Sequence, residues 1–218
     1  MSGHVHRDDF GSRLGMWLFL VTEVLFFGGA LMAYSIYRSW YPDAFASASH
    51  HLDITLGALN TAVLIVSSLT MAMAVYYSQL GDNTKVIIFL TVTLILCFAF
   101  LGIKYVEYST KIHDHLFPAF TTFHPTTTGP HGIPEELQQP VRIFLWIYFM
   151  MTGLHALHMI IGLGIMTWMY IWVANGTIDK DYTNPIEISG LYWHFVDIVW
   201  IFLFPLLYLI GRHGTGAH

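Results

Sequence analysis

The sequence predicts an all-α integral membrane protein, built as a bundle of five transmembrane helices. Of its 218 residues, 55% are hydrophobic and only 11% are charged, whereas a soluble domain carries about 25% charged residues. The mean hydropathy of +0.56 agrees with this balance. Five apolar segments are also long enough to cross about 30 Å of hydrocarbon as helices. They lack the alternation over about ten residues that marks the strands of a membrane barrel.

The five predicted spans are joined by mostly short polar segments. In order, the spans cover residues 14–37, 54–78, 85–108, 142–173 and 188–211. A polar tail precedes them at 1–13, and a second tail follows at 212–218. The long connection is 109–140, whose prolines and glycines forbid a continuous helix, so we expect a loop outside the hydrocarbon.

The second span contains small polar residues whose spacing of seven places pairs of them on shared helix faces. Such residues let helices approach closely and form hydrogen bonds across the interface. They predict a packed bundle, and they are Asn60, Thr61, Ser67, Ser68 and Thr70.

Charge and cysteine content exclude several classes of function. A net charge of −5 without a basic cluster argues against nucleic-acid binding. The single cysteine, Cys97, permits no intrachain disulfide and no CxxC metal site. The first apolar segment is too long for a signal-peptide core and lacks a cleavage site, so we expect it to be retained. Four basic residues on the N-terminal side face five on the other, so loop charge does not decide the orientation.

Ionisable residues inside the spans are the candidate functional residues, because each costs about 2.5–3.5 kcal/mol at the bilayer centre. Glu23, in the middle of the first span, either takes part in proton handling or is hydrogen-bonded to a neighbouring helix. Lys104 and Glu107 are three residues apart on one helix face, so they can form an ion pair. Such a pair near a span end is more often structural than functional.

Two histidine motifs occupy the last two spans. His155 and His158, at i and i+3, share a helix face and either hydrogen-bond to other helices or bind a metal or haem. However, no third ligand adjoins them. His194 and Asp197 have the same spacing, which favours a buried polar clasp, although an Asp can also orient a metal-bound His. Without an evident set of redox ligands, we expect a scaffold subunit with no catalytic centre and no metal site of its own.

Five stretches, in order, resemble subunit III of the haem–copper oxygen reductases, and especially that of the cytochrome c oxidases. The similarity extends from about Leu14 to Gly211, and the final W-H-F-V-D-x-V-W string is the most specific part of it. The stretches are LVTEVLFFGGALMAY at 20–34, LNTAVLIVSS at 59–68, KYVEY at 104–108, GLHALHMIIG at 153–162 and YWHFVDIVWIFLF at 192–204.

The resemblance implies an accessory subunit of an oxygen-reducing, proton-translocating enzyme of aerobic respiration. Such a subunit carries no haem or copper, which lie in the partner subunits. It stabilises subunit I, its main contact, lies in one complex with subunit II and others, binds structural phospholipids and supports proton uptake. A respiratory supercomplex is a further possible partner. By analogy, the chain lies in the bacterial plasma (inner) membrane with its N-terminus cytoplasmic and its C-terminus periplasmic.

The resemblance also assigns roles to the ionisable residues. Glu23 matches the family's membrane-embedded carboxylate. The buried polar helix contacts of the family match Lys104, Glu107, His155, His158, His194 and Asp197. The chain departs from mitochondrial members, which have two additional helices before the Glu-bearing one. Those helices are either absent here or supplied by another chain, as in five-helix bacterial members.

Three alternatives remain at this point. The family includes quinol oxidases, although Glu23 and the EVLFF segment are more similar to the cytochrome c branch. A redox-active, cytochrome b-like protein would hold haem between His155 or His158 and His194. A proton-coupled transporter would use Glu23 with the His–Asp pair, but the sequence shows neither the internal repeat nor the broken helices of that class.

Overall fold

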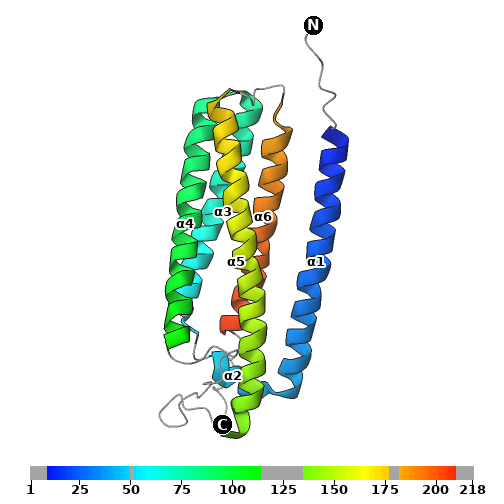
Figure 1. Cartoon of the computed structure of the whole chain (residues 1–218), viewed down its shortest axis with the longest axis vertical. Helices are drawn as coiled ribbons and strands as arrows, with labels where there is room; N and C mark the ends of the chain where they lie inside the picture. The colour runs from blue at the N-terminus through cyan, green and yellow to red at the C-terminus, as the bar shows by residue number, and fades with distance from the viewer. Residues whose placement is uncertain (1–8, 50–51, 114–134, 177–181, 210–218) are drawn as a thin grey trace.

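The prediction of five membrane-spanning helices is confirmed by the structure, a computed structural model that describes residues 9–49, 52–113, 135–176 and 182–209. Every regular element in these ranges is helical (Figure 1). The long helices are α1 (Asp9–Trp40), α3 (Ile54–Leu80), α4 (Asn83–His113), α5 (Gln138–Ala174) and α6 (Asn184–Phe204). Shorter elements are α2 (Pro42–Ser49), the 3₁₀ turn η1 (Glu135–Leu137) and the π-helical turn η2 (Pro205–Leu209).

A short turn joins α3 and α4 into an antiparallel hairpin. At the start of α3, the Asp53 carboxylate accepts hydrogen bonds from the backbone N–H groups of Thr55 and Leu56, which caps the helix. Asp82 plays a comparable part before α4, where it accepts from the Lys85 N–H and pairs with Lys85 Nζ at 2.9 Å. Hydrogen bonds from Lys85 lower the pKa of this exposed carboxyl.

The helices α3 to α6 form a four-helix bundle, and α1 lies outside it against α5 and α6 (Figure 1). Each bundle helix packs mainly against two others, in the cyclic order α3, α4, α5, α6. We call the end that contains the start of α1 and the α3–α4 turn the Arg13 end. The opposite end, where α2 packs against α5, is called the Tyr208 end.

The spans are longer than the hydropathy pattern predicts, and three elements were not predicted. Helix α1 begins at Asp9, inside the segment expected to be a polar tail, and α4 runs on to His113. The expected loop 109–140 is therefore shorter, and its Pro-rich centre lies outside the described residues. Pro140 falls in the first turn of α5, where no backbone donor is lost. The unpredicted elements are the short helix α2, the 3₁₀ turn η1 and the π-helical turn that begins at Pro205.

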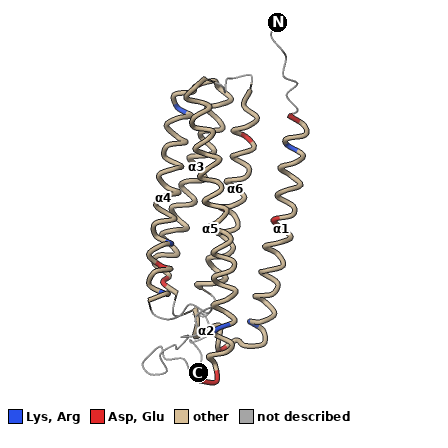
Figure 2. The backbone as a smooth tube through the Cα atoms, in the orientation of Figure 1, with Lys and Arg blue, Asp and Glu red and all other residues tan. Residues whose placement is uncertain are grey.

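Close helix packing rests on aromatic side chains set against small residues. A Cβ atom at Gly162 of α5 would lie 2.7 Å from the Trp193 ring of α6, so only glycine allows this approach. Trp193 is fully buried and donates a hydrogen bond from Nε1 to Ser67 Oγ of α3 at 2.8 Å. Charged residues gather toward the helix ends, as Figure 2 shows. Glu23 of α1 and Asp197 of α6 lie further inside their helices.

Candidate functional site

The expected ion pair between Lys104 and Glu107 is present, with Nζ and Oε2 2.7 Å apart and both side chains almost fully buried. It belongs to a larger cluster at the Tyr208 end. Tyr148 of α5 donates to Glu107 Oε1 at 2.9 Å, and Tyr208 of η2 donates to the same oxygen. Lys111 Nζ lies 3.5 Å from that oxygen. We call these five residues the Glu107 cluster.

Three members of the Glu107 cluster were not predicted from the sequence. Lys111 follows Glu107 by four residues, a spacing that favours an ion pair along a helix, so it could have been found. Tyr148 and Tyr208 come from other helices, and only the packing of α4, α5 and η2 brings them together. Because several groups share the buried charge, the cluster joins these elements without leaving Glu107 unpaired.

Glu23 contacts His158, which ties α1 to α5 in the middle of the membrane-spanning region. Glu23 Oε2 lies 3.2 Å from His158 Nε2, although the alignment falls short of a hydrogen bond. His158 Nδ1 donates to the backbone carbonyl of Leu154 at 2.8 Å, because a carbonyl can only accept. The remaining ring nitrogen therefore faces the carboxyl group. A proton on either partner turns this contact into an attractive one.

Helix α1 makes two further polar contacts with the bundle, one toward each end. At the Arg13 end, Arg13 donates to Asn184 at 2.9 Å and to Glu187 at 2.8 Å. Toward the Tyr208 end, the Tyr34 hydroxyl donates to the carbonyl of Leu206. With Glu23 between them, these contacts attach α1 at three heights.

His155 and His158 do not form a joint site, although their spacing predicts a shared helix face. His155 is fully buried between the rings of Phe100 on α4 and Trp200 on α6. In the described part of the chain, neither of its ring nitrogens has a hydrogen-bond partner. His158 instead faces α1. Positions i and i+3 differ by about 60° around a helix, and α5 uses that angle to meet different neighbours.

The expected clasp between His194 and Asp197 is not found either. His194 Nδ1 lies 2.6 Å from Ser68 Oγ, so its hydrogen-bond partner comes from α3. Asp197 is buried, and both of its carboxyl oxygens are without a hydrogen-bond partner among the described residues. Both residues lie in α6, one of the five predicted spans, but their partners depend on how α3 packs on α6.

The small polar residues of α3 form most of the predicted interhelical bonds. Trp200 Nε1 donates to Thr61 Oγ1 at 3.1 Å, and Thr70 bonds to Thr93 of α4 at 2.8 Å. With the Ser67 and Ser68 contacts, these bonds join α3 to α4 and α6. Asn60 is fully buried, but its amide atoms have no partner among the described residues.

No cluster of three or more His, Cys, Asp or Glu side chains suited to a metal ion occurs among the residues that the structure describes. Instead, Glu107 contacts lysines and tyrosine hydroxyl groups, His194 contacts a serine hydroxyl group, and His155 contacts aromatic rings. This arrangement is suited to holding helices together and to holding protons.

Comparison with known proteins places this arrangement in a family. The sequence profile described as "Cytochrome c oxidase subunit III" matches residues 2–135 and 141–212, which is most of the chain. The chain belongs to this family. It is therefore subunit III of a haem–copper oxidase, a complex that contains other oxidase subunits.

Relatives carry names from both electron-donor branches of the oxidases. The chain is 29% identical to cytochrome bo(3) ubiquinol oxidase subunit 3 of Pseudomonas aeruginosa, over 95% of this chain and 90% of the relative. It is 27% identical to cytochrome c oxidase subunit 3 of Alkalihalophilus pseudofirmus, over 92% and 87%. It is 26% identical to a probable quinol oxidase subunit 3 of Staphylococcus saprophyticus, over 94% and 92%.

Proposed function

We propose that this chain is a non-catalytic accessory subunit of a proton-pumping terminal oxidase in a bacterial inner membrane. It stabilises subunit I, binds phospholipid and supports proton uptake. The observation that carries the proposal is the use made of the buried ionisable groups. Glu107, Lys104, His158 and His194 all contact groups on other helices, which is the arrangement expected of a structural bundle.

Haem and copper belong, in this proposal, to the partner subunits. His158 Nδ1 is occupied by a backbone carbonyl, and His155 lies between two aromatic rings. A haem held between α5 and α6 would have to separate helices that contact each other directly at Gly162 and Trp193. This packing favours a scaffold over the cytochrome b-like alternative.

Supporting proton uptake is the proposed role of Glu23. This carboxyl group faces a histidine whose other nitrogen is already occupied, so Glu23 Oε2 and His158 Nε2 are close enough to exchange a proton. Both side chains remain slightly exposed, at 18% and 12%, so the pair is not sealed inside the protein.

Phospholipid binding is supported by an apolar groove of about 490 Å³ between α4 and α5, lined by Tyr108, Trp146, Ile147, Phe149 and Met150. Tyr and Trp favour the boundary between hydrocarbon and headgroups. An acyl chain in this groove would contact apolar side chains while its headgroup stayed at the Tyr208 end. Native mass spectrometry of the purified complex should show bound phospholipid that is reduced in a Trp146→Ala variant.

The electron donor is proposed to be cytochrome c, because the Glu23 segment resembles that branch. Quinol is the second candidate, because relatives named as quinol oxidase subunits are about as similar to this chain as the one named for cytochrome c. The donor is bound by other subunits, so only the assembled complex can distinguish the two.

Purification through an affinity tag on this chain tests the proposal. We expect co-purification of a larger chain with haem absorbance, and oxygen consumption supported by reduced cytochrome c. Oxygen consumption with quinol alone would move the complex to the second branch. A Soret band from the isolated tagged chain, or a purified complex without a haem-bearing partner, would contradict the accessory role.

A further inference from the structure

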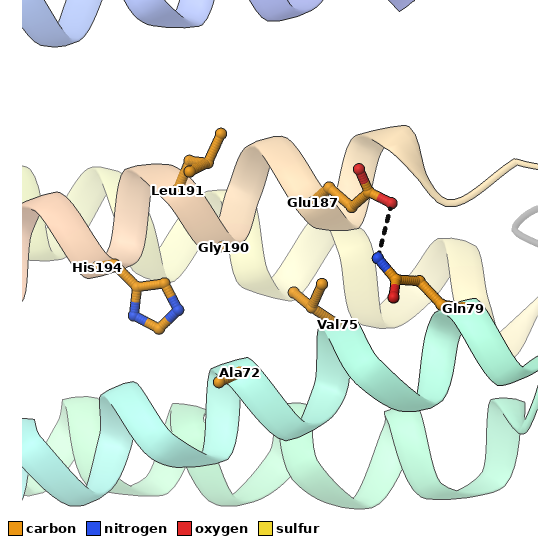
Figure 3. Close-up of a pocket in the computed structure, with 7 residues that line it drawn as sticks. All are labelled: Ala72, Val75, Gln79, Glu187, Gly190, Leu191 and His194. Atoms are coloured by element: carbon orange, nitrogen blue, oxygen red, sulfur yellow. Dashed lines mark hydrogen bonds between the residues drawn. The ribbon is translucent and has the colours of Figure 1, made fainter.

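A groove of about 330 Å³ runs between α3 and α6, starting at the Arg13 end (Figure 3). Its lining comprises Ala72, Val75, Gln79, Glu187, Gly190, Leu191 and His194. Its outer part is polar, its middle part is apolar, and an imidazole closes its inner part. Gly190 of α6 adds no side chain to the groove. A Cβ atom at this position would lie only 2.9 Å from Val75 Cγ2 of α3.

The mouth of the groove is a carboxylate held by several donors. Glu187 accepts hydrogen bonds from Gln79 Nε2 at 3.1 Å and from Thr183 Oγ1 at 3.0 Å. Its other oxygen pairs with Arg13, whose side chain is 55% exposed. Water at the membrane surface can therefore reach this end of the groove.

The inner end leads to a buried acid. Figure 3 shows the His194 imidazole pointing into the space between α6 and α3, and its Nδ1 contacts Ser68 Oγ at 2.6 Å. Ser68 also lies beside Asp197, although without a well-aligned hydrogen bond. Asp197 is 2% exposed, and its unpartnered oxygens are unusual, since buried polar groups nearly always have a partner.

We propose that this groove is a water-filled half-channel that exchanges protons between the membrane surface at Glu187 and the buried carboxyl group of Asp197, through His194 and Ser68. Ten residues separate Glu187 from Asp197, which is about 15 Å along a helix and about half of the hydrocarbon thickness. Beyond Asp197, α6 continues with the buried apolar residues Trp200 and Leu203. The path therefore ends at Asp197, which stores a proton and does not conduct it across the membrane.

The proposed proton transfer involves the side chains of His194, Ser68 and Asp197. Water delivers a proton to His194 Nε2 while the proton on Nδ1 passes to Ser68 Oγ. Ser68 in turn releases its own hydroxyl proton to the carboxylate of Asp197. The result is one proton on Asp197, an unchanged serine and the other neutral tautomer of the imidazole. Reversing the same steps returns the proton to the groove. This path does not involve Glu23, so it stands apart from the role proposed for that residue.

Cysteine accessibility in the assembled oxidase tests whether the groove holds water. Val75 lines the groove, and Ile88 is 54% exposed on α4. The hydrogen bond between Thr70 and Thr93 places these two residues at the same depth on α3 and α4. Val75 lies five residues from Thr70, and Ile88 five residues from Thr93, both toward the α3–α4 turn, so Val75 and Ile88 also lie at matched depth. A charged methanethiosulfonate added from the Arg13 end should modify Val75→Cys at least about tenfold faster than Ile88→Cys, since the reagent needs a hydrated thiolate. The mass of this chain gives the extent of reaction.

Equal, slow reaction at the two positions would overturn the half-channel, because it would mean that an acyl chain or a partner subunit fills the groove. Haem content per copy of this chain serves as the folding check. Should Val75→Cys fail to assemble, Ala72→Cys provides a second position that is already exposed in the groove.

Infrared spectroscopy tests the proton on Asp197 itself. The difference between wild-type and Asp197→Asn oxidase should contain a protonated carboxyl band that shifts in D₂O. We expect the shift to develop at least about tenfold more slowly in Ser68→Ala, which removes the relay hydroxyl, than in the control Thr70→Val, which removes a hydroxyl on the α4 side of the same helix. Absence of the band, or identical rates in both variants, would overturn the proposal.

Discussion

At the scale of single residues, Glu107 determines how charge is accommodated at the Tyr208 end. Its carboxylate accepts hydrogen bonds from Lys104, Tyr148 and Tyr208. Lys104 Nζ also lies 4.4 Å from the centre of the Trp200 ring, which adds a favourable cation–π contact. Removing the acid would therefore harm the bundle more than removing any one donor.

The first prediction compares Glu107→Leu with Tyr208→Phe. The leucine variant leaves buried lysines without their carboxylate, which costs about 3–5 kcal/mol. The phenylalanine variant removes the Tyr208 hydroxyl, which hydrogen-bonds to Glu107, Lys104 and Tyr148, but it keeps the ion pairs of the Glu107 cluster, so it costs less, about 1–3 kcal/mol. Retention of this subunit during detergent purification should thus fall sharply in the first variant and less in the second. Equal retention would mean that the Glu107 cluster does not stabilise the subunit.

Glu23 allows a second prediction at the same scale. A Glu23→Gln side chain keeps the shape and can still donate to His158, but it can no longer exchange a proton. We expect the oxidase to assemble normally, with a modest decrease in proton-uptake rate or in the number of turnovers before inactivation. Stopped-flow kinetics on the assembled complex measures both. If assembled Glu23→Gln oxidase consumed no oxygen at all, Glu23 would have a larger role than the one proposed.

At the scale of elements, small residues set the distance between helices. Gly162 lets α5 approach the Trp193 ring, and that ring is itself fixed to α3 through Ser67. One glycine therefore governs the packing of three helices. The exposed Gly164, two residues further along α5, has no atom within 4 Å of an added Cβ.

The third prediction uses this matched pair of glycines. Leucine at Gly162 would clash with the Trp193 ring and separate α5 from α6, whereas leucine at Gly164 would only add apolar surface. The melting temperature of the purified complex, or the retention of this subunit, should decrease for Gly162→Leu alone. A similar decrease for Gly164→Leu would indicate that added bulk anywhere on α5 disturbs assembly.

At this scale, the sequence predicts some features of the fold and leaves others undetermined. Hydropathy predicts each span, because a span must be apolar along its whole length. It cannot predict the turn η2, since Pro205 sits in an apolar segment that reads as one continuous helix. Spacing along one helix predicts the pair Lys104 and Glu107. It cannot predict the contact of Glu23 with His158 or of His194 with Ser68, because these depend on which helices become neighbours.

At the scale of the whole molecule, the outward faces of the helices are apolar, and α1 is the least buried of the five spans. Large side chains such as Trp17, Leu25 and Met32 are more than half exposed. Such a surface requires lipid or a partner subunit around it. Because so little of α1 is buried inside the bundle, we infer that neighbouring surfaces contribute to holding it in place.

The structure also changes the balance of charge that bears on orientation. The sequence gives four basic residues on the N-terminal side and five on the other, which is close to a tie. Lys104 and Lys111, however, are buried beside Glu107 inside α4, so they are not loop residues. The positive-inside rule counts loop residues. Without these two, the balance becomes four against three, which again differs by only one residue and does not decide the orientation.

The fourth prediction tests the orientation that the family resemblance implies, with the Arg13 end in the cytoplasm. Alkaline phosphatase is active only after export, so its insertion beside Asp82, in the α3–α4 turn at the Arg13 end, should give an inactive fusion. Insertion beside Asp53, before α3 at the Tyr208 end, should give an active fusion, because α3 separates the two sites by one membrane crossing. A cytoplasmic reporter such as green fluorescent protein should give the opposite result at each site. The reverse pattern in both assays would place the Arg13 end outside the cell, and the half-channel would then open to the periplasm.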